Sequence, residues 1–249
     1  MVLGQSERSG GLANRGADRP RADTLNWCYG VAIEDGRLYI ADTGNRRVLV
    51  FDRIPQTDGA SADLVLGQRD FTTRDENAGG PAGAMSMRWP HGIALDRGAL
   101  LIADAGDNRI MGYRALPKKS GAPCDFVLGQ RDCVSVDHNQ ATYLPTATAL
   151  NMPYGLALLG GSLVAADTAN SRLVGFDRER LAMGSAADRL TGQRAFTEKG
   201  DNRWGPATRD SLCWPYSVAS SGETAVIADS GNNRVLLWDQ ARDRSRDRA

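Results

Sequence analysis

The sequence is short of histidine and lysine and contains no long apolar run. It holds two histidines, His91 and His138, and no window of about 18 apolar residues that could span a membrane. Lysine stands only at positions 118, 119 and 199 among 30 basic residues, and such an arginine bias is typical of a GC-rich, bacterial coding sequence. The formal net charge is zero, whereas a general polyanion binder needs an excess of cationic surface. We therefore expect neither a membrane nor a nucleic acid as partner.

Known catalytic motifs are also missing. The sequence has no G-x-S-x-G nucleophile elbow, no phosphate-binding loop and no Cys-x-x-Cys pair. We expect no cofactor and no metal site. The N-terminus lacks the apolar core of a secretory signal. We therefore expect a cytoplasmic protein for the chain as given, or a secreted or periplasmic one if a leader was removed.

One segment occurs four times and aligns without a gap. Its copies run over residues 29–51, 91–113, 154–176 and 216–238, and the Gly-Gln pairs outside them recur every 62 or 63 residues. Fixed self-similarity of this kind is typical of a propeller, a solenoid or an array. The sequence predicts one repeat domain over residues 1–240, with units at about 6–68, 69–130, 131–193 and 194–240 plus 1–5. Residues 241–249 mix both charges and predict a disordered tail.

Each unit predicts four short strands. In the first unit these are residues 30–33, 37–41, 47–51 and 63–67, which are β-branched or aromatic and separated by Gly, Asp and Asn turns. The dense turn residues disfavour helix. Four antiparallel strands make one blade of a β-propeller, so the sequence predicts an all-β fold.

The residues around these strands resemble the NHL repeat family. The family pattern is Pro-x-Gly-apolar-Ala, then Ala-Asp, then Gly-Asn-x-Arg-Val, and the second copy has Pro90-His91-Gly92-Ile93-Ala94, Ala103-Asp104 and Asn108-Arg109-Ile110. The resemblance covers all four copies, in a bacterial type with recurrent Val-Leu-Gly-Gln strands. It implies a β-propeller, and it implies binding, scaffolding or catalysis in different members. The three-histidine zinc site of NHL-type amidating lyases cannot form from two histidines.

The two ends of the chain predict how such a ring closes. The chain begins with an isolated fourth strand, residues 2–5, and finishes on a third strand, residues 233–238. A four-bladed propeller of four-stranded antiparallel blades results if the N-terminal strand completes the last blade, which also removes an exposed strand edge. We expect a monomer of this kind. The alternative is a fragment, or half of a larger ring formed by a dimer.

The four cysteines are expected to be thiols. Cys124 and Cys133 flank one expected strand, and nine extended residues would place them about 30 Å apart, beyond the reach of a disulfide. Cys28 and Cys213 each adjoin a tryptophan, in the first and last copies. A bridge between these two is conceivable in a closed ring, but two buried thiols are the simpler interpretation.

An aspartate and an arginine five positions later, such as Asp42 and Arg47, occur in every copy. One identical residue per blade is expected to be structural rather than catalytic. The aspartate begins a tight turn and can accept backbone N–H groups there. The arginine is expected to tie neighbouring strands or blades through charged hydrogen bonds.

Four connectors of about 20 residues, 6–26, 69–88, 131–151 and 194–213, lead from each fourth strand to the next first strand. They are expected to share one end of the blades with the turns between second and third strands, and long loops on a rigid scaffold often carry function. Aromatic or imidazole rings stand where the innermost strands start, and asparagines recur within the connectors. The candidate ligand-binding residues are Tyr29, His91, Tyr154, Tyr216, Asn77 and Asn139. The alternatives are that the rings plug a narrow channel and that the asparagines stabilise their own turns.

The sequence predicts a non-catalytic binding or scaffolding propeller. Its long connectors would present one face to a protein partner or a small ligand. The alternative is an enzyme, a hydrolase or lyase, at the mouth of the channel. Its site would lie around His91 and His138, which with Asp137 could form a two-histidine, one-carboxylate metal site.

Overall fold

Residues 1–239, which the computed structural model describes, form an all-β protein. They contain strands β1 to β15 and eight short 3₁₀ turns, η1 to η8, and no α-helix lies among them. Within the same residues, no helix has the length and apolar character needed to cross a membrane. The predicted tail, residues 241–249, falls outside the described part of the chain.

The chain divides into two compact units. One comprises Met1–Asp107, Met111–Phe126 and Cys133–Ser135, and the other comprises Asn108–Ile110, Val127–Asp132 and the chain from Val136 onward. The boundary therefore passes within strands β7 and β8. Whether the repeats form one domain stays a prediction.

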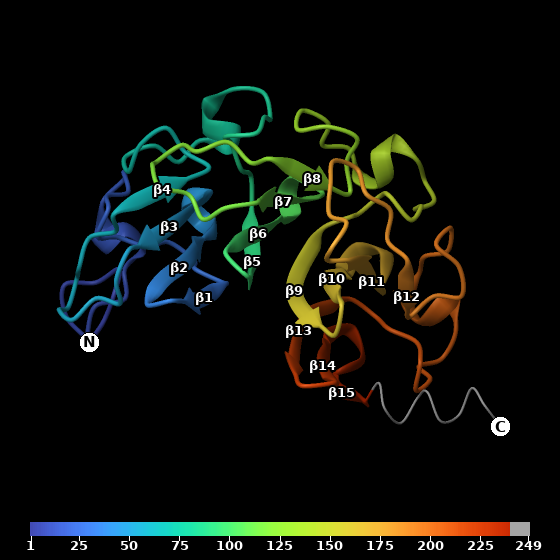
Figure 1. The fold of residues 1–249 in the computed structure, drawn as a ribbon. Helices are drawn as coiled ribbons and strands as arrows, with labels where there is room; N and C mark the ends of the chain where they lie inside the picture. Colours follow the sequence, from blue (N-terminus) through green and yellow to red (C-terminus); the bar gives the residue numbers. More distant parts are fainter. Residues whose placement is uncertain (240–249) are drawn as a thin grey trace. The chain divides into compact units, whose positions relative to one another are not determined.

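The strands form four sheets, and strands that follow one another along the chain are neighbours in each sheet (Figure 1). Three sheets have four strands and the last has three, counted over residues 1–239. The first two sheets are β1 (Val31–Glu34), β2 (Arg37–Asp42), β3 (Arg47–Phe51) and β4 (Leu64–Leu66), then β5 (Pro90–Asp96), β6 (Ala99–Asp104), β7 (Arg109–Tyr113) and β8 (Phe126–Leu128). The others are β9 (Pro153–Leu159), β10 (Ser162–Asp167), β11 (Arg172–Asp177) and β12 (Arg189–Thr191), then β13 (Pro215–Ser221), β14 (Thr224–Asp229) and β15 (Arg234–Asp239).

The predicted four strands are confirmed in the first three units, and the last unit has the first three of its predicted four. Strand β3 has the predicted bounds, while β4 is two residues shorter than the predicted 63–67. Antiparallel pairing places Val48 opposite Leu66 and Asp42 opposite Arg47. Short β-branched or aromatic runs separated by Gly, Asp and Asn turns were therefore sufficient to locate the strands.

The first strand of the later sheets carries one extra residue near its start. Pro153 pairs with Asp167 and Leu156 with Ala165, so three steps along β9 match two along β10. The same irregularity occurs between β5 and β6 and between β13 and β14. A bulge at this place changes the direction of the side chain that follows the proline. That position holds His91, Tyr154 or Tyr216.

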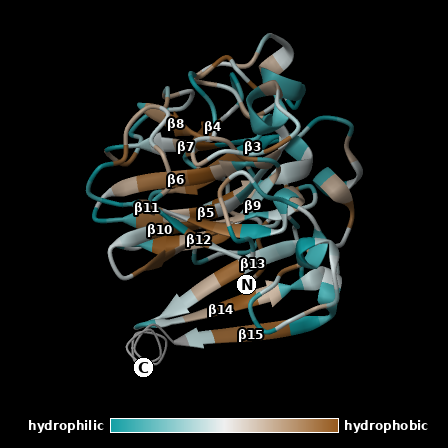
Figure 2. Ribbon diagram, turned by 90° about the vertical axis from the view of Figure 1, so that its right-hand side faces the viewer, coloured by the Kyte–Doolittle hydropathy of each residue, from teal (hydrophilic) through white to brown (hydrophobic). Residues whose placement is uncertain are grey.

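The core of each unit lies on the faces of its sheets. The strands are the most apolar segments and the connectors the most polar (Figure 2). In the first unit, Ile40, Leu49 and Val65 pack together in one buried cluster. In the second unit, Leu173, Leu212 and Ile227 belong to another. Leu212 comes from a connector, so an apolar side chain packs this connector against the sheet.

Residues 2–5 are not a β-strand here, contrary to the simplest prediction. Val2 nevertheless makes backbone contacts with the segment between β3 and β4, because its carbonyl oxygen accepts a hydrogen bond from Gly59 N at 2.9 Å. Its own N–H donates to Asp58 Oδ1 at 2.7 Å. The segment lacks a neighbouring strand within its own unit, so no ladder forms.

Two predictions about cysteine are wrong. The Sγ atoms of Cys124 and Cys133 lie 3.9 Å apart, not about 30 Å. The strand between them has only three residues, and Gly129 with φ 89° turns the chain directly after it. Cys28, expected to be buried, is exposed, whereas Cys213 is half-buried.

Candidate functional site

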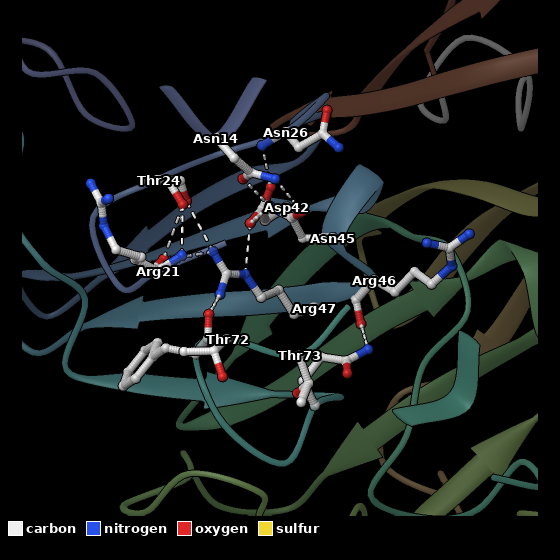
Figure 3. A network of polar contacts seen from close by, with 12 residues as sticks. Asn14, Arg21, Thr24, Asn26, Asp42, Asn45, Arg46, Arg47, Thr72 and Thr73 are labelled. Carbon is white, nitrogen blue, oxygen red and sulfur yellow. Dashed lines mark hydrogen bonds and ion pairs between the residues drawn. The ribbon is translucent and has the colours of Figure 1, made fainter. Parts of the chain in front are cut away.

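A buried arginine in the first sheet joins the Asp42 turn to the connectors on either side. Arg47 Nε donates to Asp42 Oδ2 at 2.7 Å, and both side chains are fully buried. Its Nη2 donates to the main-chain carbonyl oxygens of Arg21 and Thr24, and its Nη1 donates to that of Phe71 (Figure 3). We call this set of contacts the arginine clamp. It holds both connectors through their main chains.

The arginine clamp recurs in the second unit. Arg172 Nε donates to Asp167 Oδ2 at 2.7 Å, and both side chains are again fully buried. Its Nη groups donate to the carbonyl oxygens of Thr146, Ala149 and Phe196. The repeated aspartate and arginine therefore have the structural role that was expected. The arginine binds the connectors, however, where neighbouring strands or blades were expected.

The clamp is incomplete in the last sheet. Arg234 donates from Nε to Asp229 and from Nη2 to the carbonyl oxygens of Thr208 and Ser211. Over residues 1–239, Nη1 of Arg234 has no acceptor, and 26% of the side chain is exposed. An acceptor equivalent to Phe71 or Phe196 is missing at this place.

Each long connector contains a left-handed turn that starts at the repeated asparagine. The four asparagines have φ of 49° to 51°, in the region that asparagine tolerates better than most residues. The backbone N–H of each donates to a residue near the end of its own connector, for example Asn139 to Leu150 O at 2.9 Å. The turns are η1 (Ala13–Gly16), η3 (Glu76–Gly79), η5 (His138–Ala141) and η7 (Asp201–Trp204).

The asparagine side chains link these connectors to the turns between second and third strands. Asn139 is fully buried and exchanges two hydrogen bonds with Asn170, which lies in η6 (Thr168–Asn170). Asn77 donates to Asp107 at 3.3 Å and accepts from Ser86 at 3.0 Å. The connector and the turn therefore lie at the same end of each sheet, as expected. A ligand-binding role for Asn77 and Asn139 stays a prediction, while these contacts give both a structural role.

The rings at the start of the innermost strands form one pair within each unit. The centroids of Tyr29 and His91 are 4.5 Å apart in the first unit. Those of Tyr154 and Tyr216 are 4.8 Å apart and nearly parallel in the second. The strands that carry Tyr154 and Tyr216 also have closely spaced backbones, because a Cβ added at Gly155 would lie 2.8 Å from Val218 N. The structure thus brings the four predicted ring residues into two pairs.

His91 is the one imidazole among these four rings. It is 8% exposed, and its Nδ1 lies 3.0 Å from the carbonyl oxygen of Trp89. Burial lowers the pKa of His91 below its ordinary value of 6.5, although the Trp89 carbonyl and the Asp104 carboxylate favour the proton. The ring is therefore neutral at pH 7 and donates from Nδ1 to Trp89.

Two tryptophans beside these rings are exposed and have left-handed backbones. Trp27 and Trp214 have φ of 53° and 49°. More than half of each side chain is accessible. A bulky residue in this region is strained by about 1–3 kcal/mol, and such strain is common at functional positions. Trp27 also lies 6.0 Å from Tyr29 between ring centroids, so the apolar surface is continuous there.

A pocket of about 440 Å³ lies between two long connectors of the second unit. Tyr143, Leu144 and Trp204 form its apolar walls, and Arg194, Glu198 and Lys199 bring charged groups to it. Lys199 Nζ lies 3.7 Å from the centroid of the Tyr143 ring. Gly200 packs against the Trp204 ring, because a Cβ added at this glycine would lie 2.2 Å from the ring. Two rings and several charges thus line one opening.

Sequence reasoning missed this pocket because it favoured residues that repeat. The signal that could have found it is a break in the pattern. Trp204 stands two residues after the repeated asparagine, where the other three copies have Gly16, Gly79 and Ala141. A large aromatic residue at a position otherwise held by small residues indicates a feature of one connector alone.

A second pocket, of about 580 Å³, lies in the first unit. It is lined by connector residues such as Arg69, Pro81 and Met85, and by Ser120, Gly121 and Pro123 from the segment between β7 and β8. Its small and apolar lining contrasts with the charged pocket of the second unit. Both pockets use residues of long connectors.

The proposed metal-binding combination receives no support from side-chain positions. Over residues 1–239, no three His, Cys, Asp or Glu side chains gather closely enough to hold a metal ion. His91 belongs to the first unit, while the exposed Asp137 and His138 belong to the second. A joint catalytic site of these residues stays a prediction.

Residues 25–51 match the family described as NHL repeat. The chain carries an NHL repeat. This NHL repeat contains strands β1 to β3, the Asp42 turn and Arg47 of the clamp. The other three copies align with it without a gap, and therefore have the same pattern. No curated protein matches the sequence.

Several solved structures resemble this chain. A structural genomics protein of unknown function from Bacteroides thetaiotaomicron matches with a TM-score of 0.52 and 12% identity, over 85% of this chain and 47% of that one. The chain thus spans about half the length of that protein. The WD40 β-propeller domain of Doa1 matches with a TM-score of 0.47 and 12% identity, over 89% and 53%. Glutaminyl cyclase from Myxococcus xanthus matches with a TM-score of 0.44 and 12% identity, over 84% and 71%. At this identity the first likeness concerns the fold alone.

Proposed function

We propose that the protein is a non-catalytic binding or scaffolding module whose long connectors hold a partner protein. One observation carries this proposal: every long connector presents at least one large apolar side chain to solvent. These residues are Leu12, Met85, Val134, Tyr143, Leu144 and Trp204. Large apolar side chains exposed on long loops support an interaction role for those loops.

Buried hydrogen bonds anchor the connectors beneath these side chains. The arginine clamps and the asparagine pairs hold the connectors through buried hydrogen bonds, such as those of Arg172 to Thr146 and Ala149. Preorganised loops lose less conformational entropy when a partner binds. The connectors can therefore present exposed rings such as Tyr143 and Trp204 without ordering on binding.

The test is a chemical cross-linking capture from the organism that encodes the protein. A connector variant would combine Leu12→Ser, Met85→Ser, Tyr143→Ser and Trp204→Ser. A control variant would combine Ile54→Ser and Met183→Ser, which are also exposed but lie between third and fourth strands. The proposal predicts one partner, cross-linked to the connectors, that the control retains and the connector variant loses. A partner cross-linked around Ile54 and Met183 would contradict it.

A small ligand is a second candidate, favoured by the pocket between Tyr143 and Trp204. Aromatic walls with arginine and lysine at the rim suit a ligand that combines an apolar or aromatic body with a carboxylate or phosphate. Titration with a panel of aromatic carboxylates and organic phosphates, followed by isothermal titration calorimetry, tests this. Trp204→Ala and Arg194→Ala should each weaken binding at least tenfold, and Trp27→Ala should not. Binding that survives both pocket substitutions would exclude the site.

We further infer that the four sheets are the blades of one closed, monomeric propeller. In this arrangement residues 2–5 form the fourth strand of the last blade. Val2 supports it, because its carbonyl oxygen accepts from Gly59 N as Val65 accepts from Gly121 and Val127 from Gly184. Val65 and Val127 lie in fourth strands, β4 and β8.

Exposed apolar strand residues also support closure. Val235 and Leu237 on β15 are 60% and 70% exposed, although their counterparts Val48 and Val50 on β3 are fully buried. Val31 on β1 is likewise exposed, although its counterpart Val218 is buried. Closure would remove these side chains from water. Each one that becomes fully buried would stabilise the fold by roughly 1.5 kcal/mol or more.

The incomplete arginine clamp supports the same proposal. Its acceptors Phe71 and Phe196 each stand three residues after a Leu/Thr-Gly-Gln strand end. The residue in that position after Gln5 is Arg8. In a closed ring the carbonyl oxygen of Arg8 would accept from Nη1 of Arg234.

The register of the pairing makes closure testable. Val48 pairs with Leu66, and the same register places Leu3 opposite Val235. In a variant with all four native cysteines replaced by serine, Leu3→Cys with Val235→Cys should form an intramolecular disulfide on oxidation. Leu3→Cys with Trp238→Cys, out of register, should not. A disulfide-linked dimer would favour the ring of two chains. Deletion of Met1–Gln5 should also lower the melting temperature sharply.

A further inference from the structure

Two thiols lie in contact at the start of the third long connector. Cys124 is buried just before β8, and Cys133 is half-buried five residues after that strand ends. Their Sγ atoms are 3.9 Å apart. We propose that Cys124 and Cys133 are a redox modification site, a dithiol that closes into an intramolecular disulfide.

The two sulfur atoms need to move only a short distance to form a disulfide bond. A disulfide bond is about 2.05 Å long, so the sulfurs need to move about 2 Å closer. Cys124 is fixed by a hydrogen bond from its N–H to Ala84 O at 2.8 Å. Cys133 lies in an irregular segment between β8 and η5. The movement therefore falls to Cys133 and its neighbours.

This irregular segment is attached at both ends. Gln130 Nε2 donates to Asp137 O at 2.8 Å and to Asn108 O at 3.2 Å. Asn108 Nδ2 in turn donates to Val136 O at 2.9 Å. The segment is thus a short loop with its two ends held together and Cys133 near its middle. Rotation of the Cys133 side chain within such a loop disturbs none of these bonds.

The chemistry is exchange with a low-molecular-weight disulfide such as oxidised glutathione. Cys133 is more accessible than Cys124, so its thiolate attacks one glutathione sulfur and releases the first reduced glutathione. Cys124 then loses its proton and attacks the Cys133 sulfur, which releases the second. The two protein thiols give up two electrons and two protons in total. The two glutathione molecules take up these two electrons and two protons.

The disulfide would fix the beginning of a connector that carries part of the exposed apolar surface. Val134, next to Cys133, is exposed, and Tyr143 follows in the same connector. Pro123, next to Cys124, and Ala84 both line the pocket of the first unit. Oxidation would therefore tie the start of the third connector to a wall of that pocket. The inference does not depend on the proposed binding function.

The test uses the full chain with Cys28→Ser and Cys213→Ser, so that only this pair remains. The protein is equilibrated with mixtures of reduced and oxidised glutathione, quenched with a maleimide, and mapped by mass spectrometry. We expect loss of both thiols together, a cross-linked peptide joining Cys124 to Cys133, and a melting temperature higher by about 5 °C that dithiothreitol reverses.

Single variants separate the roles of the two thiols. With Cys124→Ser added, Cys133 should keep a stable mixed disulfide with glutathione, because the second attack is impossible. With Cys133→Ser added, Cys124 should react at least tenfold more slowly. Two thiols that react independently, or a disulfide between two chains in place of the internal one, would overturn the proposal.

Discussion

The side-chain amides of Asn139 and Asn170 hydrogen-bond to each other in both directions. Asn139 Nδ2 donates to Asn170 Oδ1 at 3.1 Å, and Asn170 Nδ2 donates to Asn139 Oδ1 at 2.8 Å. Asn170 Nδ2 also donates to Asp167 Oδ2 at 2.8 Å. The pair connects a left-handed turn in the connector to the buried ion pair of the arginine clamp. Asn14 and Asn45 repeat the arrangement in the first unit.

This geometry separates two costs of replacing Asn139. Asn139→Ala removes the amide pair and also forces alanine into a left-handed backbone with φ 51°. Asn139→Gly removes only the amide pair. We expect losses in unfolding free energy of about 2–4 kcal/mol for alanine and about 1 kcal/mol less for glycine. Urea denaturation measures both, and equal losses would show that the backbone conformation is not strained.

Replacement of the clamp arginine should cost stability. Arg172→Ala leaves Asp167 buried without its cation and removes three donors from connector carbonyl groups. We expect a loss of about 3–5 kcal/mol. The control is Arg180→Ala, whose ion pair with Asp177 is on the surface and should cost less than about 1 kcal/mol. Similar losses for the two variants in thermal or urea unfolding would contradict a structural role for the clamp.

Gly155 lies where two innermost strands of the second unit approach closely. A Cβ there would be 2.8 Å from Val218 N and 2.9 Å from Ser217 Cα. Because backbone cannot give way as a flexible side chain can, Gly155→Ala should destabilise the protein by about 1–3 kcal/mol. Gly161→Ala is the matched control, since nothing lies within 4 Å of its Cβ position. A neutral Gly155→Ala would mean that the strands are farther apart in solution.

The buried His91 predicts a pH dependence with a definite sign. Its pKa is lower in the folded protein than the ordinary value of 6.5, so the unfolded chain binds the proton more readily. The stability from the neutral ring is fully present above about pH 6.5 and falls as the pH drops from there towards the folded-state pKa.

His91→Tyr tests this, because tyrosine stands at the equivalent position in the other three copies. The variant should lose less unfolding free energy than the wild type between pH 7.5 and pH 5.5. If the wild type and His91→Tyr lose the same free energy, His91 is not the group responsible.

Much of the fold was predictable because the local sequence indicates where each strand lies. Residues 47–51 are a short run of buried, mostly apolar residues bounded by turn residues, and their predicted limits matched the structure. The structural roles of Asp42 and Arg47 followed from their recurrence in every copy. The ends of strand β4 were less predictable, since strand ends depend on neighbours that the local sequence does not contain.

The contact between Cys124 and Cys133 could not be predicted from spacing. The estimate assumed a fully extended chain, but Gly129 adopts a positive φ and the residues after it are irregular. The pocket at Trp204 was missed for a different reason. Repetition identifies what holds a blade together, whereas a ligand pocket needs residues that differ between blades.

The arginine clamps also bear on how the connectors can be altered. Within the described residues 1–239, Arg47 and Arg172 bind connector carbonyl oxygens and make no hydrogen bond to a connector side chain. Every amino acid has a carbonyl group, so these anchor points place little demand on which residue supplies it. Connector sequences between the anchors can therefore be exchanged while the loop stays in position. That makes the chain a candidate framework for grafting or randomising loops, with Asn139 and its counterparts left unchanged.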